Sequence, residues 1–576
     1  MYGRSFVAVI VAGGLALAFA ELVPVAVAAE NVATAEQPAA STGAANSPPS
    51  ATPNSPGTAA PSPPNAATPS PSPPNSPALG AANPPPRNAT VSPIPAADPV
   101  IASIRSKLGD AGLRKGADPK DLSALEAFYA ERSGPPVWIT GMGFSAKAQA
   151  VLNEIGKADD WGLAASAFEL PPAGDLPKTA DAQAVAEVKL QLAVLKYARF
   201  ARGGRADPSS LSELIDQAPP LLEPKVVLTE IAASPAPDIY LQSLHPKHEQ
   251  FQRLRQALLK ARGVGDDDAA KKPRNEQEIQ RLLINMERWR WMPADLGTIY
   301  VQDNVPEFML YVVKDGKTIH SDKIVVGQRN YATPIFSADM QSIVFNPEWT
   351  VPPTIVRENL LPNLRSGGWF GGSTSILREH GLQVKYNGRT VDPDSINWSS
   401  VNMASIAFTQ APGPTNVLGK LKFVYPNKHT VYMHDTIKQN LFNQTVRAIG
   451  HNCIRMEKPS QLAEILLQQD KGWDSKKVQD LLSRSVDEPV TLDHPIPVHT
   501  TYFTAVVDDQ GKVTSFADIY ALDRKVASVV LGKAIAYAAT ADDNDDSDAG
   551  SNAAPAAKPK AKKETVAGPI QGLFGD

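Results

Sequence analysis

The chain has 576 residues, of which 43% are hydrophobic, and a formal net charge of −4 at pH 7. This length allows several domains, and the apolar content is sufficient for a sizeable buried core. The charge balance gives no reason to expect nucleic acid as a partner. The only cysteine is Cys453, so the chain cannot form an internal disulfide.

Residues 1–29 have the pattern of an export signal. Arg4 gives a weakly positive start, residues 6–20 are apolar, and Ala26-Val27-Ala28 is a small-residue cleavage candidate. The alternative is an uncleaved membrane anchor, which would then be the chain's one contact with a membrane. No other stretch is apolar and long enough to span a bilayer. In an exported protein, a single unpaired thiol is either incidental or reactive.

Two segments are predicted to be disordered. Residues 30–98 are rich in Pro, Ala and Ser and cannot bury enough apolar surface to offset the entropy of ordering. Residues 538–576 carry an acidic run followed by a basic run, which is typical of a solvated tail. Binding of this tail to an anionic wall polymer is the alternative.

Residues 99–274 are predicted to be α-helical. The strongest pattern covers residues 181–202, where apolar residues recur at spacings of three and four before Gly203-Gly204. Further helices are predicted at 99–108, 118–132 and 248–262. His245 and His248 are interpreted as part of a turn, because no cysteine or carboxylate cluster accompanies them as metal ligands.

Residues 275–530 are predicted to be β-rich after one opening helix, residues 275–291. Asn275 and Glu278 form a capping-box pattern at its start. The run Arg288-Trp289-Arg290-Trp291 is interpreted as core-facing tryptophans beside arginines that extend to solvent. Asp315-Gly316 and Asn387-Gly388 are hairpin signals. Later, a helix at 460–470 with Ser460 as its N-cap and a strand at 495–507 are predicted.

The segment 431–455 carries the chemistry. His434 ends a strand-like alternating run, and Cys453 lies nineteen positions later at the start of a second extended segment. Neighbouring strands would place the imidazole beside the thiol, as a thiolate nucleophile requires. The alternative is a buried structural cysteine and an unrelated surface histidine.

The spacing resembles the signature of the YkuD-type L,D-transpeptidase family, which has a histidine, a spacer, and then Ser or Thr, His or another residue, Gly, Cys, a hydrophobic residue, and Arg or Asn. The matching parts are His434-Asp435-Thr436 and residues 450–455, GHNCIR. Asn452 stands where many members have glycine, which leaves the oxyanion donors less defined. Residues 331–336, 345–356 and 411–427 also resemble the large Gram-negative members.

The resemblance implies an α+β multidomain fold. It comprises a helical scaffold domain over 99–274 and a catalytic β-sandwich over 275–530. A capping insertion at 357–410 would carry Trp369 and Phe370 as lid residues. Larger relatives often have a peptidoglycan-binding module, for which the connector 263–274 leaves no room.

The resemblance also implies the activity, a peptidoglycan L,D-transpeptidase in the periplasm that carbapenems acylate. Cys453 would take a tetrapeptide stem as a thioester and pass it to a diaminopimelate amine, building the wall that sets cell shape. His434 would be the base, oriented by Asp435 or a backbone carbonyl. Arg455 would bind a substrate carboxylate, with His451 and Asn452 as further substrate or oxyanion contacts. No metal or organic cofactor is implied.

Three alternatives remain at this point. Water could resolve the same acyl-enzyme, giving an L,D-carboxypeptidase, or a lysine of an outer-membrane protein could do so, attaching that protein to the wall. A non-catalytic wall scaffold with an inert thiol is the third. Papain-like hydrolases place cysteine before histidine, whereas His434 here precedes Cys453.

Overall fold

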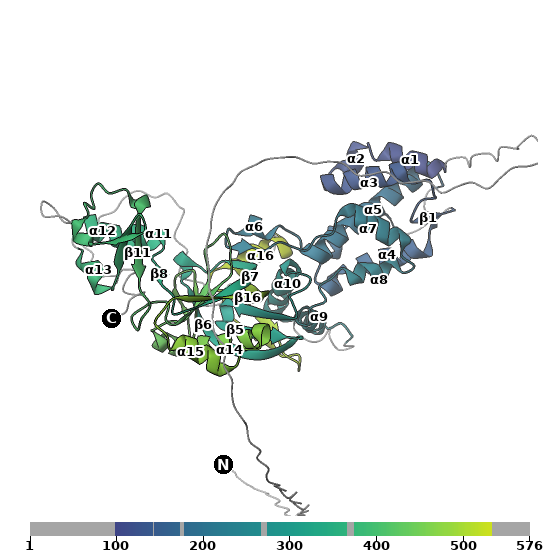
Figure 1. Ribbon diagram of the computed structural model, residues 1–576. Coiled ribbons are helices and arrows are strands. Elements are labelled where there is room, and N and C mark those ends of the chain that lie inside the picture. The colour runs from purple at the N-terminus through teal and green to yellow at the C-terminus, as the bar shows by residue number, and fades with distance from the viewer. Residues whose placement is uncertain (1–97, 142, 173–177, 266–273, 366–373, 533–576) are drawn as a thin grey trace, which may run out of the picture. The chain divides into compact units, whose positions relative to one another are not determined.

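The computed structural model describes residues 98–141, 143–172, 178–265, 274–365 and 374–532 (Figure 1). The predictions for the export signal, nearly all of the linker and the charged tail lie outside these residues. Those for Trp369 and Phe370 also lie outside them. Among the described helices, none is long and apolar enough to cross a membrane.

Helices dominate residues 98–265. They are α1 (Pro99–Lys107), α2 (Ala111–Arg114), α3 (Pro119–Glu131), α4 (Ala146–Gly156), α5 (Ala180–Gly203), α6 (Pro208–Leu211), α7 (Pro224–Ala233), α8 (Pro237–Ser243) and α9 (Glu249–Arg262). The prediction of a helical region is confirmed. Oxygen-bearing side chains cap several of these helices, and in α5 the Thr179 hydroxyl accepts a bond from the Ala182 amide at 3.3 Å. The same helix ends at Gly204, whose φ of +85° suits glycine.

The two histidines of the turn before α9 are held by separate partners. His245 is buried, stacks on Trp161 with ring centroids 4.2 Å apart, and hydrogen-bonds the Tyr197 hydroxyl through Nε2 at 3.0 Å. His248 bonds the Pro293 carbonyl oxygen through Nε2 at 2.9 Å. Burial lowers the pKa of His245 well below its usual value. Both rings therefore stabilise the fold through packing and hydrogen bonds.

Helix α10 (Glu276–Trp291) begins with the predicted capping box. The Asn275 side chain accepts a bond from the Glu278 amide at 3.2 Å, and its Nδ2 donates to Glu278 Oε2 at 3.1 Å. Trp289 and Trp291 are buried, as predicted.

The prediction that the neighbouring arginines extend to solvent is wrong. Arg290 is fully buried and donates to the backbone carbonyls of Met286 and Trp161 at 3.1 and 2.6 Å. Arg288 is 5% exposed and pairs with Asp523 at 2.5 Å. A buried guanidinium keeps its charge only when it is paired or hydrogen-bonded, and two of these partners, Trp161 and Asp523, lie far away in the sequence.

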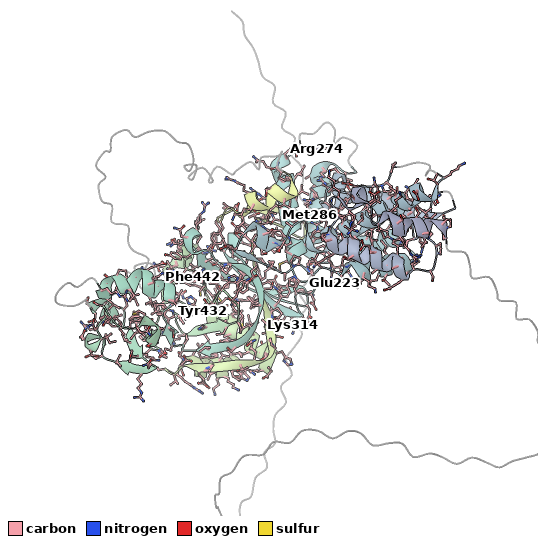
Figure 2. All side chains as sticks on the ribbon, turned by 90° about the horizontal axis from the view of Figure 1, so that it is seen from above. Glu223, Arg274, Met286, Lys314, Tyr432 and Phe442 are labelled. Atoms are coloured by element: carbon pink, nitrogen blue, oxygen red, sulfur yellow. The ribbon has the colours of Figure 1, made fainter. Side chains whose placement is uncertain are left out.

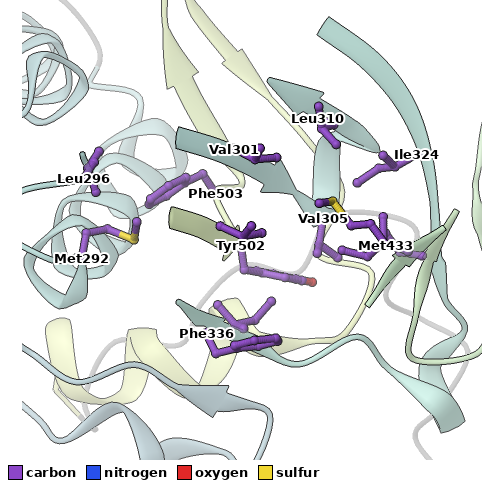
Figure 3. Packing of buried hydrophobic residues seen from close by; sticks show 14 of the residues in the cluster. Met292, Leu296, Val301, Val305, Leu310, Ile324, Phe336, Met433, Tyr502 and Phe503 are labelled. Atoms are coloured by element: carbon purple, nitrogen blue, oxygen red, sulfur yellow. The ribbon is translucent and has the colours of Figure 1, made fainter. Parts of the chain in front are cut away.

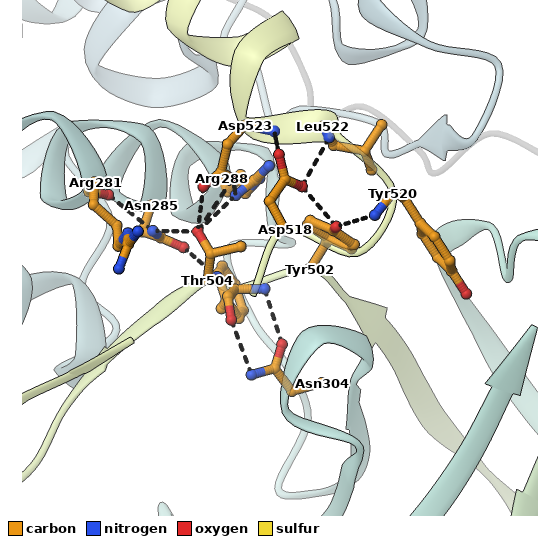
Figure 4. Close-up of polar contacts among 11 residues, drawn as sticks. Arg281, Asn285, Arg288, Asn304, Tyr502, Thr504, Asp518, Tyr520, Leu522 and Asp523 are labelled. Carbon is orange, nitrogen blue, oxygen red and sulfur yellow. Dashed lines mark hydrogen bonds and ion pairs between the residues drawn. The ribbon is translucent and has the colours of Figure 1, made fainter. Parts of the chain in front are cut away.

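A buried polar network connects α10 to the end of the chain's described part (Figure 4). Thr504 accepts a bond from the Asn285 amide group at 3.0 Å and donates to Asp523 at 2.9 Å. Beyond it, the Tyr502 hydroxyl donates to Asp518 at 2.7 Å and accepts from the Tyr520 amide at 2.7 Å. The network fixes the position of Tyr520, which reaches the candidate site described below.

Among the described residues, the main sheet has ten strands. They are β3 (Ile215–Asp216), β4 (Ile299–Asn304), β5 (Met309–Lys314), β6 (Lys317–Gly327), β7 (Ile335–Phe345), β12 (Leu421–Val424), β13 (Met433–His434), β14 (Ala448–Gly450), β15 (Ile454–Met456) and β16 (Glu488–Thr501). Their order is β12-β13-β15-β6-β5-β4-β16-β7-β3, with β14 on β6. Because β7 also pairs with β12, the path returns on itself and leaves few open edges.

The β5–β6 hairpin turns at Asp315-Gly316, with φ of +50° and +73°, as the two-residue hairpin signal predicts. Val301, Leu310, Ile324 and Met433 belong to the hydrophobic core that packs against the main sheet (Figure 3).

Two predictions near the end of the chain are wrong in detail. Helix α14 (Pro459–Lys471) has Lys458 at its N-cap position instead of Ser460, because Pro459 occupies the first turn, where its missing N–H costs nothing. The strand predicted at 495–507 is two strands, β16 and β17 (Ala505–Val507), and β16 begins earlier, at Glu488.

The segment between β7 and β12 forms a smaller packed unit, which we call the insertion. Its strands are β8 (Trp349–Thr350), β9 (Gln383–Tyr386), β10 (Arg389–Val391) and β11 (Ile406–Gln410), in the order β10-β9-β11-β8. Its core includes Leu360, Val384 and Phe408, and also Trp349 and Leu418. The packed unit thus reaches beyond the predicted range of 357–410. The Asn387-Gly388 turn joins β9 and β10 as predicted, with φ of +47° and +78°.

Candidate active site

The strand pair β13 and β15 brings the two chemically important segments together. The strands run parallel, with Met433 opposite Ile454 and His434 opposite Arg455. The register therefore places Tyr432 opposite Cys453. Successive side chains of a strand alternate between faces, so Met433 and Ile454 enter the core, where both are fully buried. Tyr432, His434, Cys453 and Arg455 share the opposite face, whereas Met456 is buried in the core like Ile454.

The neighbouring strand adds a cation to this face. In β12, Lys422 lies opposite His434, and Phe423 faces the core opposite Met433. The Lys422 ammonium lies 4.3 Å from the centroid of the Tyr432 ring. The set on this face is thus His434, Cys453, Arg455, Lys422 and Tyr432; the last of these is labelled in Figure 2. Neither Lys422 nor Tyr432 was predicted, although the two-residue alternation from His434 points to Tyr432.

His434 is 6% exposed, and its ring is oriented by the backbone. Its Nδ1 lies 2.5 Å from the carbonyl oxygen of Asp435. Because a carbonyl oxygen can only accept, Nδ1 carries the proton and Nε2 is left with a lone pair. Of the two orienting groups considered, the structure therefore has the backbone carbonyl. The Asp435 carboxylate instead accepts bonds from the amides of Lys420 and Thr436, at 2.8 and 2.7 Å.

Burial lowers the pKa of His434 to about 3, and the nearby charge of Arg455 acts in the same direction. The imidazole is therefore neutral at pH 7. A neutral ring with a free Nε2 lone pair can accept a proton from a thiol, which is the protonation state that a general base needs.

Cys453 is partly exposed, and it is a free thiol. Burial raises its pKa above the usual value, while hydrogen bonds from Tyr432 and the charges of Lys422 and Arg455 act in the other direction. At rest this face of the sheet therefore carries a protonated thiol and a neutral imidazole, and not a preformed thiolate–imidazolium pair.

Arg455 is 7% exposed, and no carboxylate among the described residues acts on its charge. Burial lowers its pKa, and the neighbouring Cys453 and Tyr432 would raise it only in their ionised forms. A nearly buried guanidinium without an acidic partner is able to bind an incoming carboxylate.

The loop after β6, residues 327–333, clamps the residues before Cys453. Its bonds run from the Gln328 amide to the Gly450 carbonyl (2.9 Å), from Asn452 Nδ2 to the Ala332 carbonyl (3.1 Å) and from the Thr333 hydroxyl to the Asn452 carbonyl (2.9 Å). Tyr520 supports the clamp, because its hydroxyl donates to the Gly327 carbonyl at 2.5 Å and accepts from the Thr333 amide at 3.2 Å.

Glycine at position 327 follows from this close packing. A Cβ on Gly327 would lie 1.9 Å from the Tyr331 carbonyl oxygen, a distance that no side chain can occupy.

His451 belongs to the turn before Cys453. Its ring stacks on that of Tyr331, with centroids 4.2 Å apart, and burial lowers its pKa. The Asn452 amide group is engaged with Ala332, so its side chain serves the clamp.

Cys453 itself precedes β15 by one residue, and the segment between β14 and β15 is a turn. The extended segment predicted from residue 450 is therefore interrupted at residues 451–453. Cys453 thus lies at the edge of β15, where it is partly exposed, as a nucleophile requires.

Two family models match the chain. Residues 123–258 match a scaffold domain, and residues 298–480 match the L,D-transpeptidase catalytic domain, YkuD. A protein of Haemophilus influenzae described as "Putative L,D-transpeptidase" is 32% identical over 251 residues, which make up 43% of this chain and 49% of that protein. The matched part thus spans about half the length of this relative. All the residues of the candidate site lie within the second matched range, except for Tyr520.

Proposed function

Because the chain carries the L,D-transpeptidase catalytic domain together with a scaffold domain, we propose that it cross-links peptidoglycan, joining diaminopimelate to diaminopimelate through a thioester on Cys453. The observation that carries the proposal is the parallel pairing of β13 with β15, which sets His434 and Cys453 on one face of the sheet. The substrates are the stem peptides of peptidoglycan, and the location is the periplasm, reached through the apolar segment at the N-terminus.

The first half-reaction is acyl transfer to the thiol. As the Cys453 sulfur attacks the carbonyl carbon between the L-centre of diaminopimelate and the terminal D-Ala, its proton passes to His434 Nε2. The tetrahedral intermediate collapses when the carbon–nitrogen bond breaks, and His434 returns the proton to the departing D-Ala amine. The products are the thioester and free D-Ala.

The second half-reaction returns the thiol. A neutral side-chain amine of diaminopimelate on a neighbouring stem attacks the thioester carbonyl, His434 accepts the amine proton, and the sulfur departs and is reprotonated. The Asp435 carbonyl stabilises the imidazolium that forms transiently in each half-reaction.

Arg455 is assigned to a carboxylate of the substrate, because it lacks an acidic partner among the described residues. His451 and the backbone of the 451–453 turn border the position of the developing oxyanion. Lys422 and Tyr432 flank the sulfur, and we assign both to contacts with the bound stem.

The test is to analyse products by liquid chromatography and mass spectrometry after the full chain has been incubated with disaccharide tetrapeptides. The proposal predicts cross-linked dimers and free D-Ala from the wild type and neither product from Cys453→Ala. Tripeptides without dimers would show that water resolves the thioester, so that the chain is an L,D-carboxypeptidase. Tripeptides coupled to an added outer-membrane protein would show protein attachment. If the wild type formed none of these products, the proposal would be contradicted.

A further inference from the structure

Tyr331 contacts both the turn that carries Cys453 and the insertion. Its ring stacks on His451, with centroids 4.2 Å apart and planes inclined by 30°. Its hydroxyl donates a hydrogen bond to Glu358 Oε2 at 2.7 Å. Glu358 belongs to the π-helical turn at Val356–Leu360, within the insertion. One side chain thus joins two parts of the catalytic region that are distant in sequence.

The position of Tyr331 is fixed by its backbone. Its amide donates to the Gln328 carbonyl at 2.8 Å, and its carbonyl oxygen lies so close to Gly327 that no Cβ would fit there. The residues on its C-terminal side form the clamp on Asn452. The backbone of Tyr331 is therefore fixed relative to the turn before Cys453, and the ring starts from a fixed position.

The bond to Glu358 is charge-assisted. The hydrogen bonds from Tyr331 and Arg357 lower the pKa of the Glu358 carboxyl, so this group is ionised at neutral pH. The same bond raises the pKa of the Tyr331 hydroxyl, which therefore keeps its proton and donates. Hydrogen bonds to ionised acceptors are stronger than bonds between neutral groups.

The insertion also reaches the site from a second direction. Tyr432, which the strand register places opposite Cys453, packs against the insertion's hydrophobic core. The insertion is therefore in contact with the surroundings of the sulfur at both Tyr432 and Tyr331. A shift of the insertion would therefore change the surroundings of Cys453, where a stem peptide must bind.

We propose that Tyr331 is a positioning residue, which holds the insertion in register with the catalytic turn through its hydrogen bond to Glu358. The inference rests on the proposed function, since the stem peptide must bind beside Cys453 and the insertion. The bond orders this region before substrate binds, so its loss weakens substrate binding more than it slows the chemistry at Cys453.

The experiment compares Tyr331→Phe, Glu358→Gln and the double variant in the full chain. Tyr331→Phe keeps the ring on His451 and removes only the donor. We expect KM for the tetrapeptide donor to rise about five- to tenfold, with kcat within about twofold of the wild type. Glu358→Gln keeps an acceptor oxygen but removes its charge, so KM should rise less than in Tyr331→Phe. The double variant should be no worse than Tyr331→Phe alone, because Tyr331→Phe has already removed the bond that Glu358→Gln weakens.

Lys385→Gln is the matched control. It breaks the Lys385–Glu348 ion pair (2.7 Å), which lies within the insertion and joins β9 to the residue before β8. KM should remain at the wild-type value. An unchanged KM in Tyr331→Phe, or an equal rise in the Lys385→Gln control, would overturn the proposal.

Hydrogen–deuterium exchange separates this inference from the proposed function. Residues 353–365 should exchange faster in Tyr331→Phe than in the wild type, whether or not the chain forms any product. Unchanged exchange there would overturn the positioning role. Faster exchange in a protein that makes no product even as wild type would contradict the proposed function alone.

Discussion

The imidazole of His434 donates its Nδ1–H to the backbone carbonyl oxygen of Asp435, at 2.5 Å. This bond sets the tautomer and leaves Nε2 as the basic atom, on the face of the sheet that also carries Cys453. The neighbouring carboxylate is committed to two backbone amides, so a backbone group performs the orienting task that an aspartate has in other triads.

Replacing His434 tests its role as the base. His434→Gln should lower kcat for cross-linking by about 10²- to 10⁴-fold, because the thiol then loses its proton acceptor. Steady-state kinetics of dimer formation measure this effect. His499→Gln is the control, since that buried ring lies in the same domain and bonds Ser337 and the Leu296 carbonyl. A similar loss of kcat per folded molecule in both variants would argue against a catalytic role.

The reactivity of Cys453 should depend on pH in a characteristic way. Its pKa is raised by burial, and the pKa of His434 is about 3, so neither a thiolate nor an imidazolium exists in the resting protein near neutral pH. The rate of alkylation by iodoacetamide should rise steadily with pH and level off only above pH 9. A plateau that is already complete by pH 6 would reveal a preformed ion pair and contradict this assignment.

His434 should also make the stability of the fold depend on pH. Its pKa is about 3 in the folded protein and 6.5 at its ordinary value, so the unfolded chain binds the extra proton between these limits. Above pH 6.5 the neutral ring therefore does not lower the free energy of unfolding. As the pH falls from 6.5 toward 3, the free energy of unfolding decreases by about 1.4 kcal/mol per pH unit, because the unfolded chain binds the proton. Between pH 6.5 and pH 5, the free energy of unfolding measured with denaturant should fall by about 2 kcal/mol less in His434→Gln than in the wild type. Equal losses would show that the ring is not buried in its neutral form.

Glycine at position 327 should be essential for the clamp. Gly327→Ala forces a Cβ against the Tyr331 carbonyl oxygen, so the loop must shift away from the turn before Cys453. We expect the free energy of unfolding to fall by about 2–4 kcal/mol. We also expect the thiol to become less reactive where the shifted loop displaces the turn before Cys453. Gly156→Ala, in helix α4, is the control, because a Cβ there meets nothing within 4 Å. It should be neutral or slightly stabilising, and similar behaviour of the two variants would contradict the packing argument.

Local signals in the sequence predicted much of the fold. The capping box of Asn275 and Glu278 and the two-residue turn at Asp315-Gly316 both depend on residues within a few positions of one another, and both are confirmed. The family resemblance is likewise confirmed by the two family matches. By contrast, the burial of Arg288 depends on Asp523, more than two hundred residues away, and no local pattern reveals such a partner.

The candidate site likewise contains residues that the sequence predicts and residues that only the structure reveals. Its central pair follows from the spacing of His434 and Cys453 and from the resemblance, whereas Lys422 reaches the site only through the register of β12 with β13. Register is set by long-range pairing, so it could not be read from the residues around Lys422. The clamp by the 327–333 loop was missed for the same reason: its partners lie about 120 positions later.

The central claim is that Cys453 carries the acyl group. The most direct measurement is the intact mass of the purified chain after incubation with a carbapenem, in the wild type and in Cys453→Ala. The account predicts that the wild type gains the mass of one carbapenem and that the Cys453→Ala variant, still folded, gains nothing. No adduct on the wild type, or an equal adduct on the variant, would contradict it.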